Sequence, residues 1–484
     1  MNTSSQNSLE HVFDWEAQRA FSELSGDRNP MHMNAVAARR THAGRPVVHG
    51  MNSVLWALET LAGKGEIQQP IAQIKVRFQK LIYVGDAVTL EVIRRDIAGI
   101  SLQLCVDELP VSSIKIGFGE ALQGVAHEMA SDVIPPRAWP EEPVNLSLTQ
   151  VENASGWLAF AQNVEAAPHA FPRLSAAIGQ RRVSALACMS RLVGMVCPGM
   201  HSTFFSLTVN SSESLGSRDA IRYAVTSVHD QFRLVKQTVE GGGWSGTIES
   251  IARIPPVAQP TLQDLAGLVR QGEFQETNAL IVGGSRGLGE LTAKLIVAGG
   301  GAVTITYAIG RDDAIEVQRQ IREWGGRCEV LHYDATLPAT DQFEHLASIP
   351  TSLYYFATTP IFLRKTRLYS PAVFERFHRV YAEGFFEVCT SALRDSKPGS
   401  SVFYPSSVAV EDHPIDMTEY AMAKAAGEIL CHDLARSNEG FRFIVERLPR
   451  MLTDQTATVM PVKTVAPLEI MLPIVRRMEA REFS

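Results

Sequence analysis

The spacing of apolar residues changes along this chain and divides it into segments with different folds. Between residues 71 and 118, apolar positions alternate with polar ones in four runs separated by turn-forming sequences, which is typical of half-buried antiparallel strands. Just before them, residues 52–61 show apolar side chains at helical spacing. The pattern predicts one buried helix followed by an antiparallel sheet. The four runs are Ile71 to Phe78, Ala87 to Arg94, Ser101 to Asp107 and Val111 to Phe118.

The same order, helix then strands, recurs more weakly between about residues 145 and 256. An amphipathic stretch covers residues 182–196, and the strand-like runs after it cover residues 202–209, 221–228, 232–239 and 246–252. We interpret this segment as a second, degenerate copy of the first. The alternative is a single α+β domain of other origin.

From about residue 275, apolar strands alternate with helical stretches, which favours a doubly wound parallel sheet. A proline cluster at residues 135–140 and a proline-rich run at residues 253–260 mark boundaries. The sequence therefore predicts a multidomain α+β and α/β protein. We expect domains at 1–140, 141–256 and 275–484, with a linker at 257–274.

The composition excludes several classes of function. The chain has 484 residues, 45% of them hydrophobic, and 45 basic against 52 acidic residues give a net charge of −7. This balance does not favour binding to nucleic acid or to an anionic membrane. No apolar run reaches the ~18 residues of a spanning helix. The six cysteines show no metal-binding spacing, so we expect no metal, and a reducing, cytoplasmic environment.

The stretch from Phe21 to Ala38 places a carboxylate and an imidazole five positions apart in what reads as a polar, turn-rich loop. A neutral histidine can take a proton from water while a neighbouring carboxylate orients that water or returns a proton. Asp27 and His32 are therefore predicted to be an acid-base pair. The plainer interpretation is that Asp27 caps a turn and His32 is a surface histidine.

This stretch resembles the signature of the MaoC-like (R)-specific enoyl-thioester hydratases, and the resemblance continues through residues 44–51 (GRPVVHGM). It implies a hot-dog fold, in fact a double hot-dog if the second copy is real. It also implies that Asp27 and His32 are catalytic, and that Asn29 and the N–H groups of Gly50 and Met51 hold the substrate and its thioester oxygen. The matching residues are Phe21, Leu24, Ser25, Gly26, Asp27, Asn29, Pro30, His32 and Ala38.

A glycine-rich turn follows the strand predicted at residues 279–282 and precedes a helix predicted at residues 290–297. Its G-x-x-x-G-x-G spacing resembles that of short-chain dehydrogenases, whose Rossmann-type fold binds a dinucleotide here. The resemblance implies cofactor contacts at Gly283, Ser285, Arg286, Gly287, Leu288 and Gly289.

The second strand of this region, residues 302–307, lacks the terminal acid that would bind the ribose 2′-hydroxyl of NAD. Tyr307 stands at its end, and Arg311 together with Arg286 offers positive charge for a 2′-phosphate. We therefore expect NADP(H), although Asp312 and Asp313 lie nearby. By the family resemblance, Asp334 contacts the adenine and Ala357 lies against the cofactor.

Ser407, Tyr420 and Lys424 have the spacing of the family's catalytic residues. Tyr420 and Lys424 are four positions apart on a predicted helix, so they share a face, and the ammonium is expected to lower the phenol pKa. Two departures from the family stand out. Tyr381 occupies the position of the helical asparagine, and residues 355–358 (YFAT) replace Asn-Asn-Ala-Gly.

The two resemblances together predict a bifunctional enzyme that reduces 3-oxoacyl thioesters with NADPH and interconverts (R)-3-hydroxyacyl and 2-enoyl thioesters. Its partners would be acyl-CoA or acyl carrier protein substrates and further copies of the same chain, as a homodimer or higher oligomer. Arg39, Arg40 and Arg45 could meet a carrier phosphate or could simply be solvated. Two alternatives stay open: a reductase for a different ketone, and a non-catalytic NADP-binding module.

Overall fold

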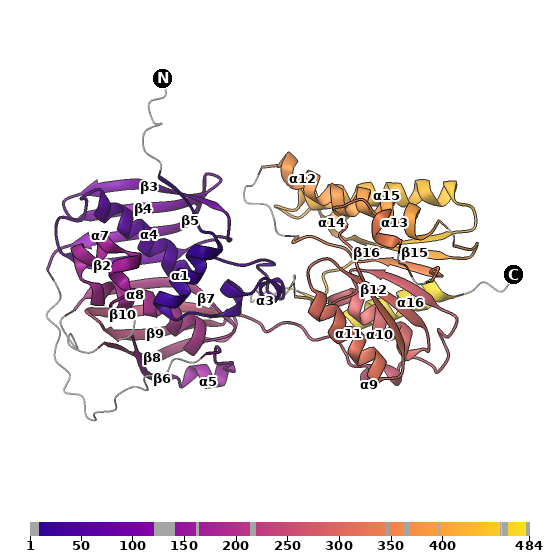
Figure 1. The fold of residues 1–484 in the computed structure, drawn as a ribbon, viewed down its shortest axis with the longest axis horizontal. Helices are drawn as coiled ribbons and strands as arrows, with labels where there is room; N and C mark the ends of the chain where they lie inside the picture. Colours follow the sequence, from indigo (N-terminus) through magenta and orange to yellow (C-terminus); the bar gives the residue numbers. More distant parts are fainter. Residues whose placement is uncertain are drawn as a thin grey trace, which may run out of the picture. The chain divides into compact units, whose positions relative to one another are not determined.

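The structure is a computed structural model. It describes residues 9–120, 141–160, 164–212, 219–344, 346, 348–361, 368–394, 396–454, 456 and 463–480. The chain forms two compact units, the first over Met1–Pro255 and the second over Pro256–Ala457 and Val462–Ser484. Figure 1 shows both units, each of which is described by itself below.

The first unit is built on one ten-stranded antiparallel sheet in the order β1-β3-β4-β5-β2-β7-β10-β9-β8-β6. The two halves of the sheet repeat the same strand order from the edge inward. Strands β6, β8, β9, β10 and β7 of the second half correspond to β1, β3, β4, β5 and β2 of the first. The strands are β1 (Leu9–Val12), β2 (Ile71–Phe78), β3 (Ala87–Asp96), β4 (Gly99–Val106), β5 (Leu109–Phe118), β6 (Ser155–Ala159), β7 (Ser202–Ser211), β8 (Ala220–His229), β9 (Leu234–Gly241) and β10 (Trp244–Ala252).

Two long helices occupy equivalent places in the two halves of this sheet, one before β2 and one before β7. They contact each other and share one apolar core with the sheet. These two helices are α4 and α8 (Figure 1). The helices are α1 (Trp15–Ser25), α2 (Pro30–Met33), α3 (Ala35–Arg39), α4 (Gly50–Gly63), α5 (Leu148–Glu152), α6 (Ala167–Ala170), α7 (Pro172–Ile178), α8 (Gln180–Arg191) and a π-helical turn, η2 (Leu192–Val196).

The halves meet where β2 pairs with β7, with Ile74 opposite Val209 and Val76 opposite Leu207. Each half is thus a helix wrapped by strands, which is the hot-dog arrangement, and the first unit is a double hot-dog. The second copy, detected only weakly in the sequence, is structurally complete. Strands β1 and β6, which close the two edges of the sheet, have no counterpart among the runs that the sequence predicted.

The second unit contains a six-stranded parallel sheet in the order β13-β12-β11-β14-β15-β16. This is the doubly wound order in which the strand sequence reverses between the first and fourth strands. The strands are β11 (Asn278–Val282), β12 (Ala302–Tyr307), β13 (Arg327–His332), β14 (Ser352–Tyr355), β15 (Ser401–Ser407) and β16 (Arg442–Leu448).

Separate apolar cores lie on the two faces of this sheet. One contains side chains of α10, α11 and α16, and the other contains side chains of α12, α13 and α15. The predicted Rossmann-type architecture is confirmed. The helices are α9 (Leu262–Ala266), α10 (Gly287–Ala298), α11 (Arg311–Glu323), the 3₁₀ turn η3 (Asp341–Phe343), α12 (Pro371–His378), the π-helical turn η4 (Arg379–Glu383), α13 (Gly384–Ala392), α14 (Ala409–Asp412), α15 (Thr418–Ser437) and α16 (Pro467–Glu479).

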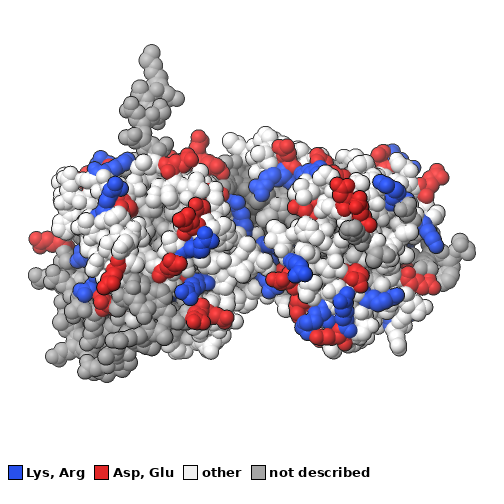
Figure 2. Space-filling model, viewed as in Figure 1, with Lys and Arg blue, Asp and Glu red and all other residues white. Residues whose placement is uncertain are grey.

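Charged groups of both signs are interspersed on the surface. Figure 2 shows Lys and Arg side chains mixed with Asp and Glu side chains over both units on the face drawn. Within the part of the chain that the structure describes, no helix has the length and apolar content needed to cross a bilayer. All six cysteines are buried and free.

Candidate active sites

The acid-base stretch of the first unit is more helical than the sequence suggested. Phe21 lies in α1, which ends at Ser25 and is followed by a C-cap glycine, Gly26, in the left-handed conformation (φ 75°), and His32 lies in the short helix α2. The expected polar loop is therefore only the link between two helices. Asn29 caps α2 by accepting a hydrogen bond from the N–H of Met31 (3.0 Å), and Pro30 takes the first helical position.

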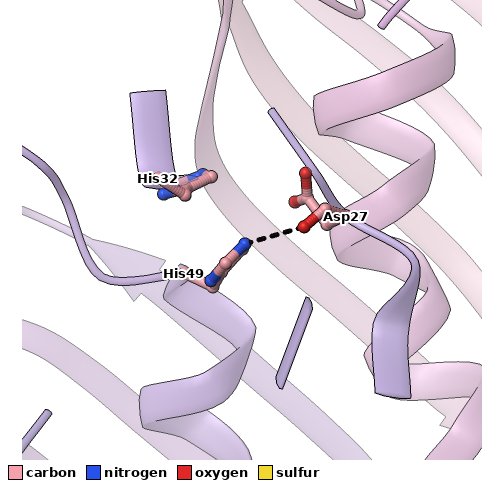
Figure 3. A group of neighbouring side chains, drawn as sticks. All are labelled: Asp27, His32 and His49. Atoms are coloured by element: carbon pink, nitrogen blue, oxygen red, sulfur yellow. Dashed lines mark hydrogen bonds between the residues drawn. The ribbon is translucent and has the colours of Figure 1, made fainter. Parts of the chain in front are cut away.

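Asp27 and His32 come together as the sequence predicted. One carboxylate oxygen of Asp27 and one imidazole nitrogen each of His32 and His49 lie within 4.8 Å of one another (Figure 3). Asp27 is fully buried, and both Asp27 and His32 line a cavity that also contacts Gly50 at the start of α4. Gly50 and Met51 form the first turn of α4, where N–H groups have no acceptor within the helix. A carboxylate, an imidazole and a helix N-terminus therefore converge on one cavity.

The hydrogen bonds of His32 identify its free nitrogen. Nδ1 lies 2.7 Å from the carbonyl oxygen of Val47, so Nδ1 carries the proton and donates it. Burial lowers the pKa of His32, while the charge of Asp27 opposes this shift. His32 is thus neutral at pH 7 and presents the lone pair of Nε2.

Asp27 is buried, but neighbouring groups stabilise the ionised form of its carboxyl group. Burial raises its pKa, and this shift is opposed by the positive charge that His32 carries when protonated, by a hydrogen bond from Ser190 and by the backbone N–H of Asn29. Ser190 Oγ donates to Asp27 Oδ2 over 2.7 Å, and Asn29 N donates to Oδ1 over 3.1 Å. Ser190 lies on α8, so the half that lacks the acid-base stretch contributes directly to the site.

The same half also contributes backbone groups. Asn29 Nδ2 donates to the carbonyl oxygen of Gly194 (2.7 Å) and lies within hydrogen-bond distance of that of Met200 (3.2 Å). The side chain that we expected to contact the substrate oxygen instead fastens the acid-base stretch to the second half. Gly194 is in the π-helical turn η2, and a Cβ there would approach Asp27 Oδ1 to 2.5 Å. Only glycine leaves room for the carboxylate.

His49 is a further member of the cluster that the sequence did not single out. Its ring stacks on that of His32 at 4.1 Å between centroids, and its Nε2 lies 3.1 Å from the backbone oxygen of Asp27 (Figure 3). Its Nδ1 faces Gln18 Oε1 at 3.3 Å. Because both nitrogens of His49 face oxygen acceptors, this imidazole is poorly placed to ligate a metal. It supports His32 and the backbone of Asp27.

In the second unit, the predicted cofactor residues follow the carboxyl ends of the parallel strands, where doubly wound sheets bind ligands. The glycine-rich turn begins after β11, and Ala357 follows β14, the strand beside it. Gly283 (φ 81°) passes close to this neighbour, since a Cβ on Gly283 would lie 2.8 Å from the carbonyl carbon of Phe356. Gly289 likewise has no room for a Cβ, which would lie 2.3 Å from Gly283 O.

The remaining predicted cofactor residues are spread along the same edge of the sheet. Ser285 is buried in the glycine-rich turn, Arg286 occupies the N-cap position of α10 without a side-chain capping bond, and Gly287 and Leu288 begin that helix. Nη1 of Arg286 lies 3.5 Å from the carboxylate of Asp454. The positive charge expected to meet a 2′-phosphate is therefore shared with an acid that the sequence did not indicate.

Tyr307 and Arg311 flank the end of the second strand, as expected. Tyr307 is the last residue of β12 and packs edge-on against His332, while Arg311 opens α11. Asp334 follows β13, and its carboxylate accepts hydrogen bonds from the N–H and the hydroxyl of Thr336.

Ser407 and Tyr420 are joined, but Lys424 behaves differently from expectation. Burial raises the pKa of Tyr420, and hydrogen bonding by the Ser407 side chain opposes this shift. Lys424 Nζ donates instead to the carbonyl oxygen of Pro405 (2.7 Å) and lies 6.0 Å from the Tyr420 ring centroid. Burial lowers the pKa of Lys424 to about 7. An ammonium that depresses the phenol pKa is therefore not a feature of this structure.

Tyr381 explains the position of the lysine. Its ring covers Lys424 Nζ at 4.0 Å from the centroid, and its hydroxyl lies 2.7 Å from Thr358 Oγ1. The carbonyl oxygen of Tyr381 accepts a hydrogen bond from Tyr404 (3.0 Å). Tyr381 belongs to the π-helical turn η4, so each candidate site lies beside such a turn.

Comparisons with known proteins agree with this geometry. A profile of the MaoC like domain matches residues 9–111, and a profile of the short chain dehydrogenase family matches residues 277–446. The uncharacterized oxidoreductase YgfF of Escherichia coli strain K12 is 30% identical over an alignment of 175 residues, and the match covers 32% of this chain and 68% of that protein. The chain belongs to the short-chain dehydrogenase family and carries a MaoC-like domain.

Two further proteins resemble the separate units. The (R)-specific enoyl-CoA hydratase of Aeromonas caviae is 42% identical over 77 residues, 15% of this chain and about half, 55%, of the hydratase. The structure of a short chain dehydrogenase from Shigella flexneri complexed with NADP is 18% identical, covering 44% of this chain and 94% of the other, with a TM-score of 0.40.

The MaoC-like site contains three residues that sequence reasoning missed. Ser190 and Gly194 lie in the weak second copy, where no signature marks them, and only the three-dimensional pairing of the halves brings them to Asp27. His49 was visible within the matched run at residues 44–51, and its place immediately before the α4 N-terminus was a usable signal.

Proposed function

We propose that this chain is a bifunctional acyl-thioester enzyme. Its short-chain dehydrogenase unit reduces a 3-oxoacyl thioester to the (R)-3-hydroxyacyl thioester with NADPH, and its MaoC-like unit reversibly dehydrates that product to the 2-enoyl thioester. The observation that carries the proposal is the Asp27–His32 pair, buried beside the N-terminus of α4 in one cavity. The product of the proposed reduction is the substrate of the proposed dehydration, and this supports the assignment of both reactions to one chain.

In the hydration direction, Nε2 of His32 accepts a proton from a water that the Asp27 carboxylate orients. The oxygen of that water bonds to C3 of the enoyl group, and the electron pair of the double bond moves toward the thioester oxygen as enolate charge. The N–H groups of Gly50 and Met51 stabilise that charge at the helix N-terminus. The proton then returns to C2 from the acid-base pair. General acid-base catalysis of this kind contributes about 10²–10⁴ in rate.

In the reductase unit, Tyr420 is the proton donor to the ketone oxygen, and the Ser407 hydroxyl, with which it is hydrogen-bonded, orients the substrate carbonyl. A bound nicotinamide supplies the hydride. The close approaches at Gly283 and Gly289 leave a turn that can hold a pyrophosphate against the N-terminus of α10. The residues present therefore fit the dinucleotide.

The choice of NADP(H) rests on charge. β12 ends in Tyr307 rather than an acid, and Arg286 and Arg311 lie at the same edge of the sheet. The pairing of Arg286 with Asp454 weakens its contribution, so Arg311 becomes the more important partner in this proposal. Both residues are within the proposed 2′-phosphate site.

The substrate carrier is proposed to be coenzyme A or an acyl carrier protein, with Arg39, Arg40 and Arg45 as candidate phosphate contacts. Arg45 already pairs with Asp86 (3.1 Å) and stacks on Tyr83, which makes it the weakest of the three candidates. Because one chain supplies both halves of the double hot-dog, the hydratase unit needs no second copy. A homodimer or higher oligomer would form through the reductase unit.

One experiment separates this proposal from its rivals. The purified full chain is assayed with crotonyl thioester for hydration and with acetoacetyl thioester and NADPH for reduction. Both activities are expected. Hydration without reduction, although NADPH binds, would favour a reductase for another ketone or a non-catalytic NADP-binding module. The observation that favours a non-catalytic NADP-binding module is that Lys424 Nζ donates to the carbonyl oxygen of Pro405 and lies against the ring of Tyr381.

A further inference from the structure

The buried face of α1 carries a stripe of polar side chains beside the MaoC-like site. Gln18, Ser22 and Ser25 are spaced by four and three positions, so they share one face of the helix, and they are 0%, 4% and 0% exposed. Ser22 Oγ donates to the carbonyl oxygen of Asp27 (2.8 Å), and Ser25 Oγ accepts from its N–H (3.1 Å). Two residues of the stripe therefore hold the backbone of the acid.

Gln18, the third residue of the stripe, bonds to the segments around the imidazole base. Its Nε2 donates to the carbonyl oxygens of Val47 (3.0 Å) and His32 (3.2 Å). The carbonyl oxygen of Val47 is also the one that accepts from His32 Nδ1 (2.7 Å). A primary amide has two N–H bonds, so each carbonyl oxygen can have its own donor. The amide thus holds both the main chain of His32 and the acceptor of its ring.

The oxygen end of the same amide faces the start of α4. Because the two carbonyl oxygens can only accept, the NH₂ end of Gln18 must face them and Oε1 must face His49. Oε1 lies 3.3 Å from His49 Nδ1 and 3.4 Å from its backbone nitrogen. His49 is the N-cap residue of α4 and directly precedes Gly50 and Met51. One side chain therefore joins the segment that carries the base to the helix end that would stabilise the enolate.

We infer that Gln18 is a positioning residue of the hydratase site, which sets His32 at a fixed separation from the N-terminus of α4. This inference rests on the proposed hydratase function. In that reaction the base and the helix end must reach the substrate together, and a misplacement of about 1 Å can cost 10²-fold in rate. Within the described part of the chain, Gln18 does not line the cavity, so it acts through the residues that it holds.

The test compares Gln18→Met with Gln237→Met in hydration of crotonyl thioester by the full chain. Methionine approximates the shape of glutamine and removes its hydrogen bonds. Gln237 is the matched control, because it is also 0% exposed and its Nε2 donates to a backbone carbonyl oxygen, that of Cys197 (3.3 Å). Both variants should have a lower melting temperature. Only Gln18→Met should lower kcat, by about 10- to 10²-fold, with KM nearly unchanged.

Gln18→Glu tests the hydrogen bonds separately from the shape. Burial and the two facing carbonyl oxygens favour the protonated form of the new carboxyl group, which keeps one donor and one acceptor. This variant should therefore recover part of the kcat that methionine loses, while remaining below the parent.

Parental kcat in Gln18→Met overturns the inference. So does a loss that appears in KM instead of kcat, or an equal loss of kcat in Gln237→Met, since either would indicate a general loosening of the fold. Should Gln18→Met fail to fold, Gln18→Glu decides: a lowered kcat at parental KM supports the inference, and parental kcat overturns it. Failure of the parent chain to hydrate crotonyl thioester overturns the proposed hydratase function instead.

Discussion

The two candidate active sites differ in how their key groups are engaged. In the MaoC-like unit, Asp27 accepts a hydrogen bond from Ser190, His32 donates one to the carbonyl oxygen of Val47, and both residues line the cavity. In the dehydrogenase unit, Lys424 lies four positions after Tyr420, as the family spacing requires. Its Nζ nevertheless donates a hydrogen bond to the carbonyl oxygen of Pro405 and lies against the ring of Tyr381. Spacing along the chain identifies the residues of a site, but neighbouring side chains decide whether they are available.

The largest expected effect tests the more complete site. Asp27→Asn and His32→Ala should each lower kcat/KM for hydration of crotonyl thioester by about 10³-fold, because the two groups act on one water. The double variant should be little worse than either single one. Glu23→Gln, an exposed acid on α1, is the control. Near-normal turnover in either single variant contradicts the assignment.

The next effect concerns the second site and its independence from the first. Tyr420→Phe removes the proton donor and should lower NADPH-dependent reduction of acetoacetyl thioester by about 10²-fold or more. Hydration by the same preparation should not change. Loss of both activities would mean that the substitution damages the whole chain, and retained reduction would assign the proton to another group.

A smaller effect is expected where the second half of the sheet supports the first. Ser190→Ala removes a hydrogen bond that lowers the Asp27 pKa, so this pKa should rise further. The ionised carboxylate then persists only at higher pH, and the acid limb of the kcat/KM profile for hydration should move upward in pH. The rate at the optimum should fall about tenfold, and Ser190→Thr should restore the profile. An unmoved acid limb would make Ser190 merely structural.

The preference for NADPH over NADH should depend on the charged residues near the end of β12, with a smaller effect than those above. Fluorescence titration is expected to give a roughly tenfold tighter Kd for NADPH than for NADH, as one charge-assisted contact suffices. Asp454→Asn releases Arg286 and should increase this preference, whereas Arg311→Gln should decrease it. Tighter binding of NADH would show that the end of β12 has been misinterpreted.

The smallest effect is expected from freeing Lys424, which would make this residue as accessible as the acid-base pair of the MaoC-like site. Tyr381→Asn removes the ring over Lys424 and should raise kcat for reduction severalfold if this cover limits the lysine. Tyr381→Phe keeps the ring and loses only the bond to Thr358, so it is the control. An equal gain in both variants would point to the hydroxyl instead of the ring.

Much of the fold was predictable because each element carries a local signal. Alternation located β2 and β5 almost to the residue, and the glycine-rich turn located β11 and α10. Short edge strands such as β1 and β6 were missed because four or five residues give too little periodicity. The helix α1 was hidden by the polar residues that surround Phe21.

The candidate sites were predictable to a smaller extent. Asp27 and His32 are close in sequence, so a motif could pair them, and Ser407 and Tyr420 have a fixed spacing on one fold. Contacts between distant segments carry no such signal. Neither the bond from Ser190 to Asp27 nor that from Asp454 to Arg286 could be read from composition or periodicity, because each joins residues more than 150 positions apart.

The pairing of β2 with β7 has a consequence for how this protein can change over time. In a symmetric homodimer every substitution appears in both subunits, so a residue that serves one site alters its mirror image too. Here the two hot-dogs are encoded separately and joined edge to edge. One copy was free to keep the acid and the imidazole, and the other to keep the serine and glycine that hold them. Asymmetry of this kind is open to a fused pair and closed to an identical one.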